Sequence, residues 1–140
     1  MIRNTSAFFL WICLLSSCQT EENTPTGPIN DGFDTSKAML VKKGTMMGIG
    51  HTVSGDASIY ILDGKHTVVL DPYSSQNGPD LKVYLSKDVK ASSYIRLGNL
   101  KSTSGKQSYD VPAGTDITQY NFVHVWCEQF SVEFGRAEVK

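Results

Sequence analysis

Residues 121–135 read NFVHVWCEQFSVEFG, and this stretch determines the class of fold that the sequence predicts. Successive side chains of a strand point to opposite faces of a sheet. The stretch therefore separates into two faces: Phe122, His124 and Trp126 on one, and Val123, Val125 and Cys127 on the other. Cys127 is predicted to lie on the apolar face, among valines, where a core residue would pack.

Short apolar runs separated by turn signals continue on both sides of this stretch, and no long run repeats every three to four positions. Turns are expected at 42–44 and 54–56, and Asp63-Gly64 is typical of a type I′ hairpin. A single helical turn is expected over 116–120. Strands are expected over 38–41, 45–49, 57–62, 65–70, 80–86, 94–100, 107–111, 122–127 and 130–139. Roughly eight to ten short strands predict an all-β fold, an antiparallel β-sandwich or jelly-roll-like barrel.

The first seventeen residues, 1–17, have the composition of a signal peptide. Arg3 precedes an apolar run over 7–15 that is too short to span a bilayer. The sequence Leu-Ser-Ser-Cys that ends at Cys18 resembles the bacterial lipobox, which implies lipidation of Cys18; a plain secreted protein would share the apolar run. Gln19 after this cysteine resembles lipoproteins of the outer membrane. The expected location is the bacterial cell envelope, with a lipid anchor and either a periplasmic or a surface-exposed domain.

The remaining chain is expected to contain one tether and one domain. Residues 18–36 are rich in Thr, Pro, Gly, Asn and acidic residues, which is typical of a flexible tether. Residues 37–140 form the predicted β domain. The 13 basic and 14 acidic residues give a net charge of -1 without a basic patch, which argues against nucleic acid as a partner.

Cysteine usage leaves one thiol for the folded domain. Of the three cysteines, Cys13 leaves with the leader and Cys18 would carry lipid, so Cys127 has no partner in its own chain. It is a packed thiol, a redox centre, a metal ligand or half of an intermolecular disulfide. A reactive thiol needs a nearby cation, a helix N-terminus or a metal, and the next residue, Glu128, is an acid.

His51 and His124 are the candidate cofactor-binding residues that would accompany Cys127. Together with the methionines they could notionally form a blue-copper set, yet no His or Met follows Cys127 closely, and His124 would lie on the opposite face of the strand. Cys127 could also be an axial haem ligand, although no haem-attachment motif is present. Haem and copper therefore remain open without support from a motif, and no metal site is predicted.

Several blocks of sequence share their order with a known family. They are Gly48–His51 with Ser54-Gly55; Asn77–Leu81 with Val83–Leu85; Leu97-Gly98; Gly105, Gln107 and Tyr109; and Val125–Cys127 with Phe130–Val132 and Phe134-Gly135. Over most of residues 36–137 the chain resembles the DM13 domain, often called the electron transfer DM13 domain. The resemblance implies a compact β domain, found in exported bacterial proteins, in which the cysteine that matches Cys127 is proposed to be redox-active.

We therefore expect an envelope lipoprotein with a redox or electron-transfer role centred on Cys127, which is not an enzyme by itself and has a protein redox partner or a small ligand. The alternative is a non-catalytic module that binds a ligand, a glycan or a protein through its loops. Aromatic side chains, among them Tyr84, Tyr94, Tyr109 and Trp126, could form a sugar-stacking or electron-hopping surface, although such residues are more often core. No serine-histidine-acid set can be placed from the spacing.

Overall fold

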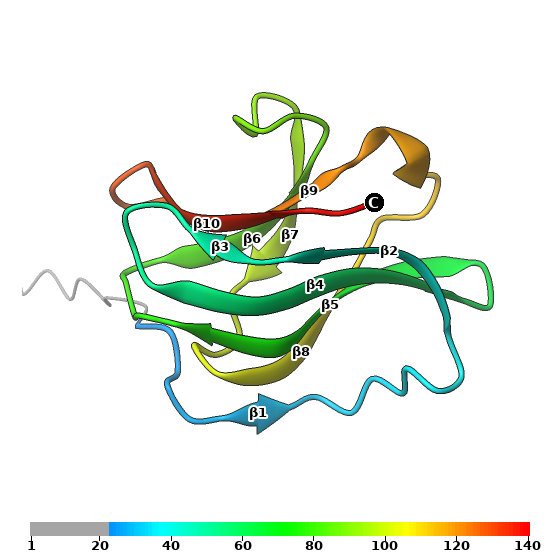
Figure 1. Ribbon diagram of the computed structural model, residues 1–140, viewed down its shortest axis with the longest axis horizontal. Helices are drawn as coiled ribbons and strands as arrows, with labels where there is room; N and C mark the ends of the chain where they lie inside the picture. The colour runs from blue at the N-terminus through cyan, green and yellow to red at the C-terminus, as the bar shows by residue number, and fades with distance from the viewer. Residues whose placement is uncertain (1–22) are drawn as a thin grey trace, which may run out of the picture.

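The structure, a computed structural model, describes residues 23–140, and these form two five-stranded sheets that pack face to face (Figure 1). The predicted signal peptide, Cys18 and the first residues of the predicted tether lie outside the described residues. Within the described part, no helix is long and apolar enough to cross a membrane.

The first sheet has the strand order β1-β8-β5-β4-β2. Its strands are β1 (Ile29–Asn30), β8 (Gly105–Asp110), β5 (Lys65–Ser75), β4 (Val53–Leu62) and β2 (Met39–Thr45). The pairs are antiparallel except for β1, which runs parallel to β8.

The second sheet has the order β3-β10-β9-β6-β7, and all of its pairs are antiparallel. Its strands are β3 (Met47–Gly48), β10 (Val132–Glu138), β9 (Phe122–Cys127), β6 (Leu81–Ser86) and β7 (Tyr94–Asn99). A 3₁₀ turn over Ile117–Gln119 precedes β9, close to the helical turn that the sequence predicts. The prediction of an all-β antiparallel sandwich is confirmed, and the two sheets of the described chain do not close into a barrel.

The hydrophobic core lies between the inner faces of the two sheets. Its fully buried members include Ala57, Ile59, Val68 and Leu70 from the first sheet, and Leu81, Val83, Leu85, Val123, Val125 and Cys127 from the second. Burying one Val, Leu or Ile side chain contributes about 1.5–3 kcal/mol, so this layer is the main source of stability. The predicted inward direction of Cys127 and its valine neighbours is confirmed.

The hairpin between β4 and β5 is the one that the sequence predicts. Asp63 has φ 50° and Gly64 has φ 76°, as a type I′ turn requires. The turns predicted at 42–44 and 54–56 are wrong, because these residues continue β2 and β4. The glycines in these two segments allow neighbouring backbone to come close and do not reverse the chain. A Cβ on Gly44 would overlap the Glu138 carbonyl. Gly55, at φ 113°, occupies a bulge against Pro72.

The flexible tether predicted over 18–36 is wrong for residues 23–36, because these pack on the domain. Thr24 is buried, and the Pro25 carbonyl accepts a hydrogen bond of 2.9 Å from Thr103 N. The Asp31 carboxylate accepts hydrogen bonds from Ser108 N at 2.6 Å and from Lys101 Nζ at 2.8 Å. The segment is held by polar and backbone contacts and has little apolar periodicity, so its sequence pattern does not reveal it.

We predict that a chain beginning at Lys37 is less stable than one beginning at Asn23. The shorter chain loses β1 and the hydrogen bonds of Pro25, Gly27 and Asp31, each worth about 1 kcal/mol net. Urea unfolding of the two chains should show a loss of about 2–4 kcal/mol. Equal stabilities would show that residues 23–36 contribute nothing to the fold.

Candidate functional site

Strand β6 is buried on both of its faces, which the sequence does not predict. All six of its residues are buried. Leu81, Val83 and Leu85 point into the core, whereas the alternate residues Lys82, Tyr84 and Ser86 lie on the outer face of the second sheet. They are opposite the outward residues of β9 in the pairs Lys82↔Trp126, Tyr84↔His124 and Ser86↔Phe122. We call Lys82, Tyr84, Ser86, His124 and Trp126, with the neighbouring Tyr94 and Glu128, the outer strip.

Three aromatic rings stack along the outer strip. The ring centroid of Tyr84 lies 4.2 Å from that of Tyr94 and 5.9 Å from that of Trp126, with interplanar angles of 16° and 19°. Tyr84 is buried at the centre of the stack, while Tyr94 on β7 is 49% exposed. These rings, with Ala91, Glu128 and Ser131, line a surface recess of about 430 Å³. The stack therefore connects the interior of the outer strip with solvent.

The Tyr84 hydroxyl is paired with a carboxylate. It donates a hydrogen bond of 2.7 Å to Glu128 Oε1, and Arg96 Nε donates to the same oxygen at 2.7 Å. The hydrogen bond from Arg96 lowers the pKa of Glu128, although burial opposes this shift. Burial, followed by the bond to Glu128, raises the pKa of Tyr84 well above its usual value. An ionised carboxylate thus accepts a hydrogen bond from a phenol that keeps its proton.

His124 lies fully enclosed in a serine-histidine-acid arrangement that sequence spacing does not reveal. Its Nε2 is 2.7 Å from Ser86 Oγ, and its Nδ1 is 2.7 Å from Glu133 Oε1. Both His124 and Ser86 have no exposed surface, and Ser86 Oγ donates at 2.7 Å to the carbonyl of Asp88. With its hydroxyl proton engaged and no access for substrate, this serine is not a nucleophile. The network holds the 87–93 loop on the sheet.

Cys127 lies on the opposite face of β9 from this network. Its side chain has no exposed surface, and its thiol donates to the carbonyl oxygen of Pro79 at 2.9 Å. Its strand partners are Leu81 and Val132. The redox role of Cys127 stays a prediction, and these surroundings are those of a packed thiol.

The structure does not bring His51, His124 and Cys127 together as a set of ligands. His51 stacks on the Phe134 ring with centroids 3.8 Å apart, and its Nδ1 lies 3.1 Å from the Ile49 carbonyl. Both ring nitrogens of His124 and the thiol of Cys127 are engaged as described above. No group of three or more His, Cys, Asp or Glu residues among 23–140 is arranged to hold a metal ion. These residues fit neither a haem nor a copper ion.

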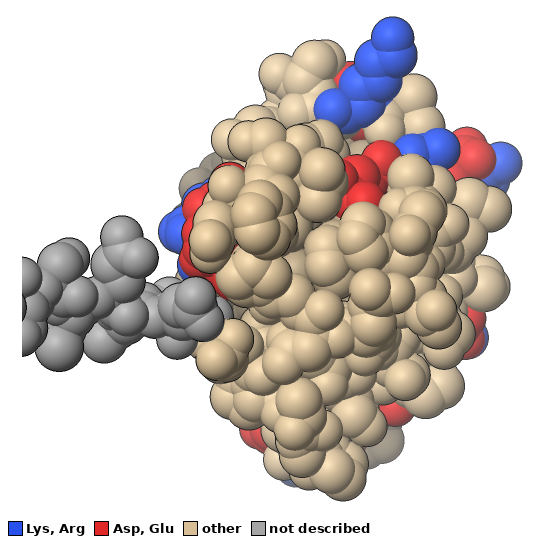
Figure 2. Space-filling model, turned by 90° about the vertical axis from the view of Figure 1, so that its left-hand side faces the viewer, with Lys and Arg blue, Asp and Glu red and all other residues tan. Residues whose placement is uncertain are grey.

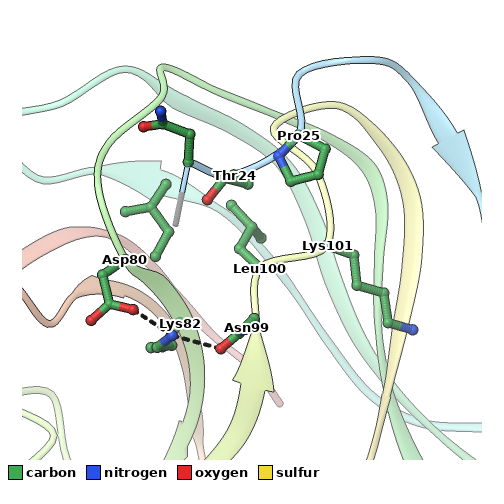
Figure 3. A pocket seen from close by; sticks show the side chains of 9 residues that line it. Thr24, Pro25, Asp80, Lys82, Asn99, Leu100 and Lys101 are labelled. Atoms are coloured by element: carbon green, nitrogen blue, oxygen red, sulfur yellow. Dashed lines mark hydrogen bonds and ion pairs between the residues drawn. The ribbon is translucent and has the colours of Figure 1, made fainter. Parts of the chain in front are cut away.

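A second hollow lies at the end of β6 where the N-terminal segment packs (Figure 3). It has a volume of about 310 Å³, and its walls include Thr24, Pro25, Asp80, Lys82 and Asn99. The Lys82 ammonium, itself buried, contacts Asp80 and donates to Asn99 Oδ1 at 2.6 Å. Burying a charge is costly unless it is paired, so these contacts explain how an outward lysine can lie inside the protein.

Sequence reasoning identified Trp126, Tyr84 and Tyr94 as candidate surface aromatics but not their partners Glu128 and Arg96. The pairing of β6 with β9 and β7 creates these contacts between residues more than thirty positions apart. The one feature of the sequence that could have indicated these partners is Glu128, a carboxylate directly after Trp126 and Cys127.

Comparison with known proteins gives one family. The family model described as electron transfer DM13 matches residues 46–139, a range that contains the whole outer strip and Cys127. No curated protein and no solved structure matches the chain.

We predict that Cys127 reacts slowly with a small thiol reagent in the folded protein. If access requires a local opening that costs about 3 kcal/mol or more, the reaction should be at least about a hundredfold slower than that of free cysteine. Reagent kinetics at neutral pH, with and without denaturant, provide the measurement. A native rate close to that of free cysteine would mean that the sulfur is accessible, and a faster one that it is also activated.

Proposed function

Because the chain belongs to the electron transfer DM13 family, we propose that its domain passes single electrons between redox partners and that the outer strip is the route. The observation that supports this route is the stack of Trp126, Tyr84 and Tyr94 beside the carboxylate of Glu128. Indole and phenol side chains can lose one electron each, and stacked rings give short transfer distances. The phenol must also release its proton, for which Glu128 is in place.

The proposed transfer runs from a reduced donor protein at Tyr94 to an oxidising partner at Trp126. The oxidant takes one electron from Trp126, whose indole proton leaves to water. Trp126 recovers an electron from Tyr84 and a proton from water, while the Tyr84 proton moves to Glu128. Tyr84 then takes an electron from Tyr94 and its proton back from Glu128, while the Tyr94 proton leaves to water. The donor finally returns an electron to Tyr94, which takes a proton from water, so that one electron has moved from donor to oxidant.

A redox centre at Cys127 is the alternative to the outer strip as the site of electron transfer. Thiol-disulfide exchange requires an attacking sulfur to reach Sγ in line, and enclosure by the core blocks that approach. We therefore assign the electron route to the outer strip and a packing role to Cys127.

We further propose that the domain works in the bacterial cell envelope, held by lipid on Cys18 after removal of residues 1–17. The support comes from the sequence: Arg3, the apolar run over 7–15 and the lipobox-like residues that end at Cys18. Acyl chains contribute about 0.8 kcal/mol per buried methylene, so several of them give a stable anchor. The redox partners would then be envelope or membrane proteins.

A glycan- or ligand-binding module is the second candidate, and the recess beside Tyr94 and Trp126 favours it. A sugar ring could stack on an exposed aromatic face there while Glu128 and Ser131 offer hydrogen-bond partners. Binding would change the fluorescence of Trp126, the one tryptophan within residues 23–140.

We predict that Tyr84→Phe interrupts the route. After pulsed one-electron oxidation of Trp126 in a chain that begins at Asn23, the indolyl radical should decay as a tyrosyl radical appears, at a rate independent of protein concentration. Phenylalanine cannot supply the electron, so the transfer should slow by at least about tenfold, the effect of ~1.4 kcal/mol on a barrier. Time-resolved absorbance of the two radicals is the measurement.

Tyr60→Phe is the matched control, because Tyr60 lies on β4 in the other sheet and packs on Phe33. It should leave the rate unchanged. Equal rates in the parent chain and in Tyr84→Phe would remove the outer strip as the route.

A further inference from the structure

Asn23, the first described residue, lies at the end of the sandwich where the connection between β5 and β6 is found. Asn23 forms a β-bridge with Pro79, in the connection between β5 and β6. Two other connections meet this one: Gln76 N donates to the Thr52 carbonyl at 3.0 Å, and Glu128 N donates to the Asp80 carbonyl at 3.1 Å. We call residues 48–53, 75–79 and 129–131 the loop end.

Residues 48–53, 75–79 and 129–131 carry no Lys, Arg, Asp or Glu, and neither do residues 23–29, which pack next to them. The carboxylates of Asp80 and Glu128, which complete two of these connections, are paired with Lys82 and Arg96. The opposite end, at the β4–β5 hairpin, carries Asp63, Lys65 and Asp110. Figure 2, which faces the left-hand side of Figure 1, shows a broad uncharged area, with a group of acidic side chains in the upper part of the face and further charged residues along its edge. Phe130 is 63% exposed at the loop end, and the adjoining Met47 is 57% exposed.

The distance from the proposed lipid to the loop end is short. Four residues, Gln19 to Glu22, separate Cys18 from Asn23 in the sequence. Five residue steps span at most about 18 Å when fully extended. A tether that continued to residue 36 would have allowed the domain to turn freely, but the contacts of residues 23–36 leave only this short connection.

From the uncharged loop end and the short connection, we infer that the loop end lies against the lipid surface, with Phe130 at the headgroup level. This inference depends on the lipid anchor proposed above. Aromatic side chains favour the membrane interface, and a face whose bordering carboxylates are paired with cations costs less to bring to the headgroups than one with unpaired charges. Trp126 is opposite Lys82, near the end of β6 that adjoins the loop end, whereas Tyr94 is opposite Ser86, at the other end of β6. Tyr94 would therefore face a donor away from the membrane.

The test uses the full chain with its leader, expressed in a bacterium, purified and reconstituted into vesicles of phosphatidylethanolamine and phosphatidylglycerol. A fluorophore is attached in the folded protein at Gln129→Cys or, as the matched control, at Lys65→Cys; both positions are exposed and lie at opposite ends. Quenchers attached to lipid headgroups should reduce the signal at position 129 several-fold more than at position 65. A Gly/Ser spacer of about twenty residues after Glu22 should remove most of this difference.

The mass of the N-terminal peptide shows whether Cys18 carries lipid. It therefore distinguishes a failure of the proposed lipid anchor from a failure of the proposed orientation. If Cys18 carries no lipid, the anchor fails. If Cys18 is lipidated and positions 129 and 65 are quenched equally, the anchor stands and the orientation is overturned.

Discussion

The pairing of β6 with β9 is the constraint on which the rest of the structure depends. Six residue pairs, from Leu81↔Cys127 to Ser86↔Phe122, place the two strands side by side at the centre of the second sheet. Their inner faces complete the core, while the 87–93 loop and neighbouring side chains cover the outer face of β6. Since buried polar groups need partners, each polar residue of β6 brings another element to the strand. Lys82 holds Asp80 and Asn99, Tyr84 holds Glu128, and Ser86 holds His124.

The hydrogen bonds of His124 show how closely this outer face is determined. Ser86 donates its hydroxyl proton to Asp88, so His124 Nε2 must donate to Ser86. The other ring nitrogen faces the Glu133 carboxylate, which also contacts Arg136 at 2.8 Å. A network of this kind stabilises the fold only when every member is satisfied, which suits a structural clamp better than a catalytic site.

Much of the fold could be predicted from the sequence because its signals are local. Alternation assigned Cys127 to the core face, and Asp63-Gly64 predicted the central hairpin. The N-terminal segment could not be predicted, because Pro25 and Asp31 hold it through a backbone carbonyl and a carboxylate that leave no apolar pattern. The polar partners in the outer strip were missed for a different reason. Ser86 and His124 are 38 positions apart, and only the strand register brings them together.

In the proposed route, electrons pass along the aromatic side of β9 and the sulfur side packs in the core, although Trp126 and Cys127 are neighbours in sequence. The most direct test is to identify the radical that remains when the chain from Asn23 is oxidised by one electron and frozen. Electron paramagnetic resonance should then show a tyrosyl radical. Its spectrum should depend on Glu128, and it should persist in Cys127→Val. A radical centred on sulfur, lost in that variant, would contradict the account and return the redox role to Cys127.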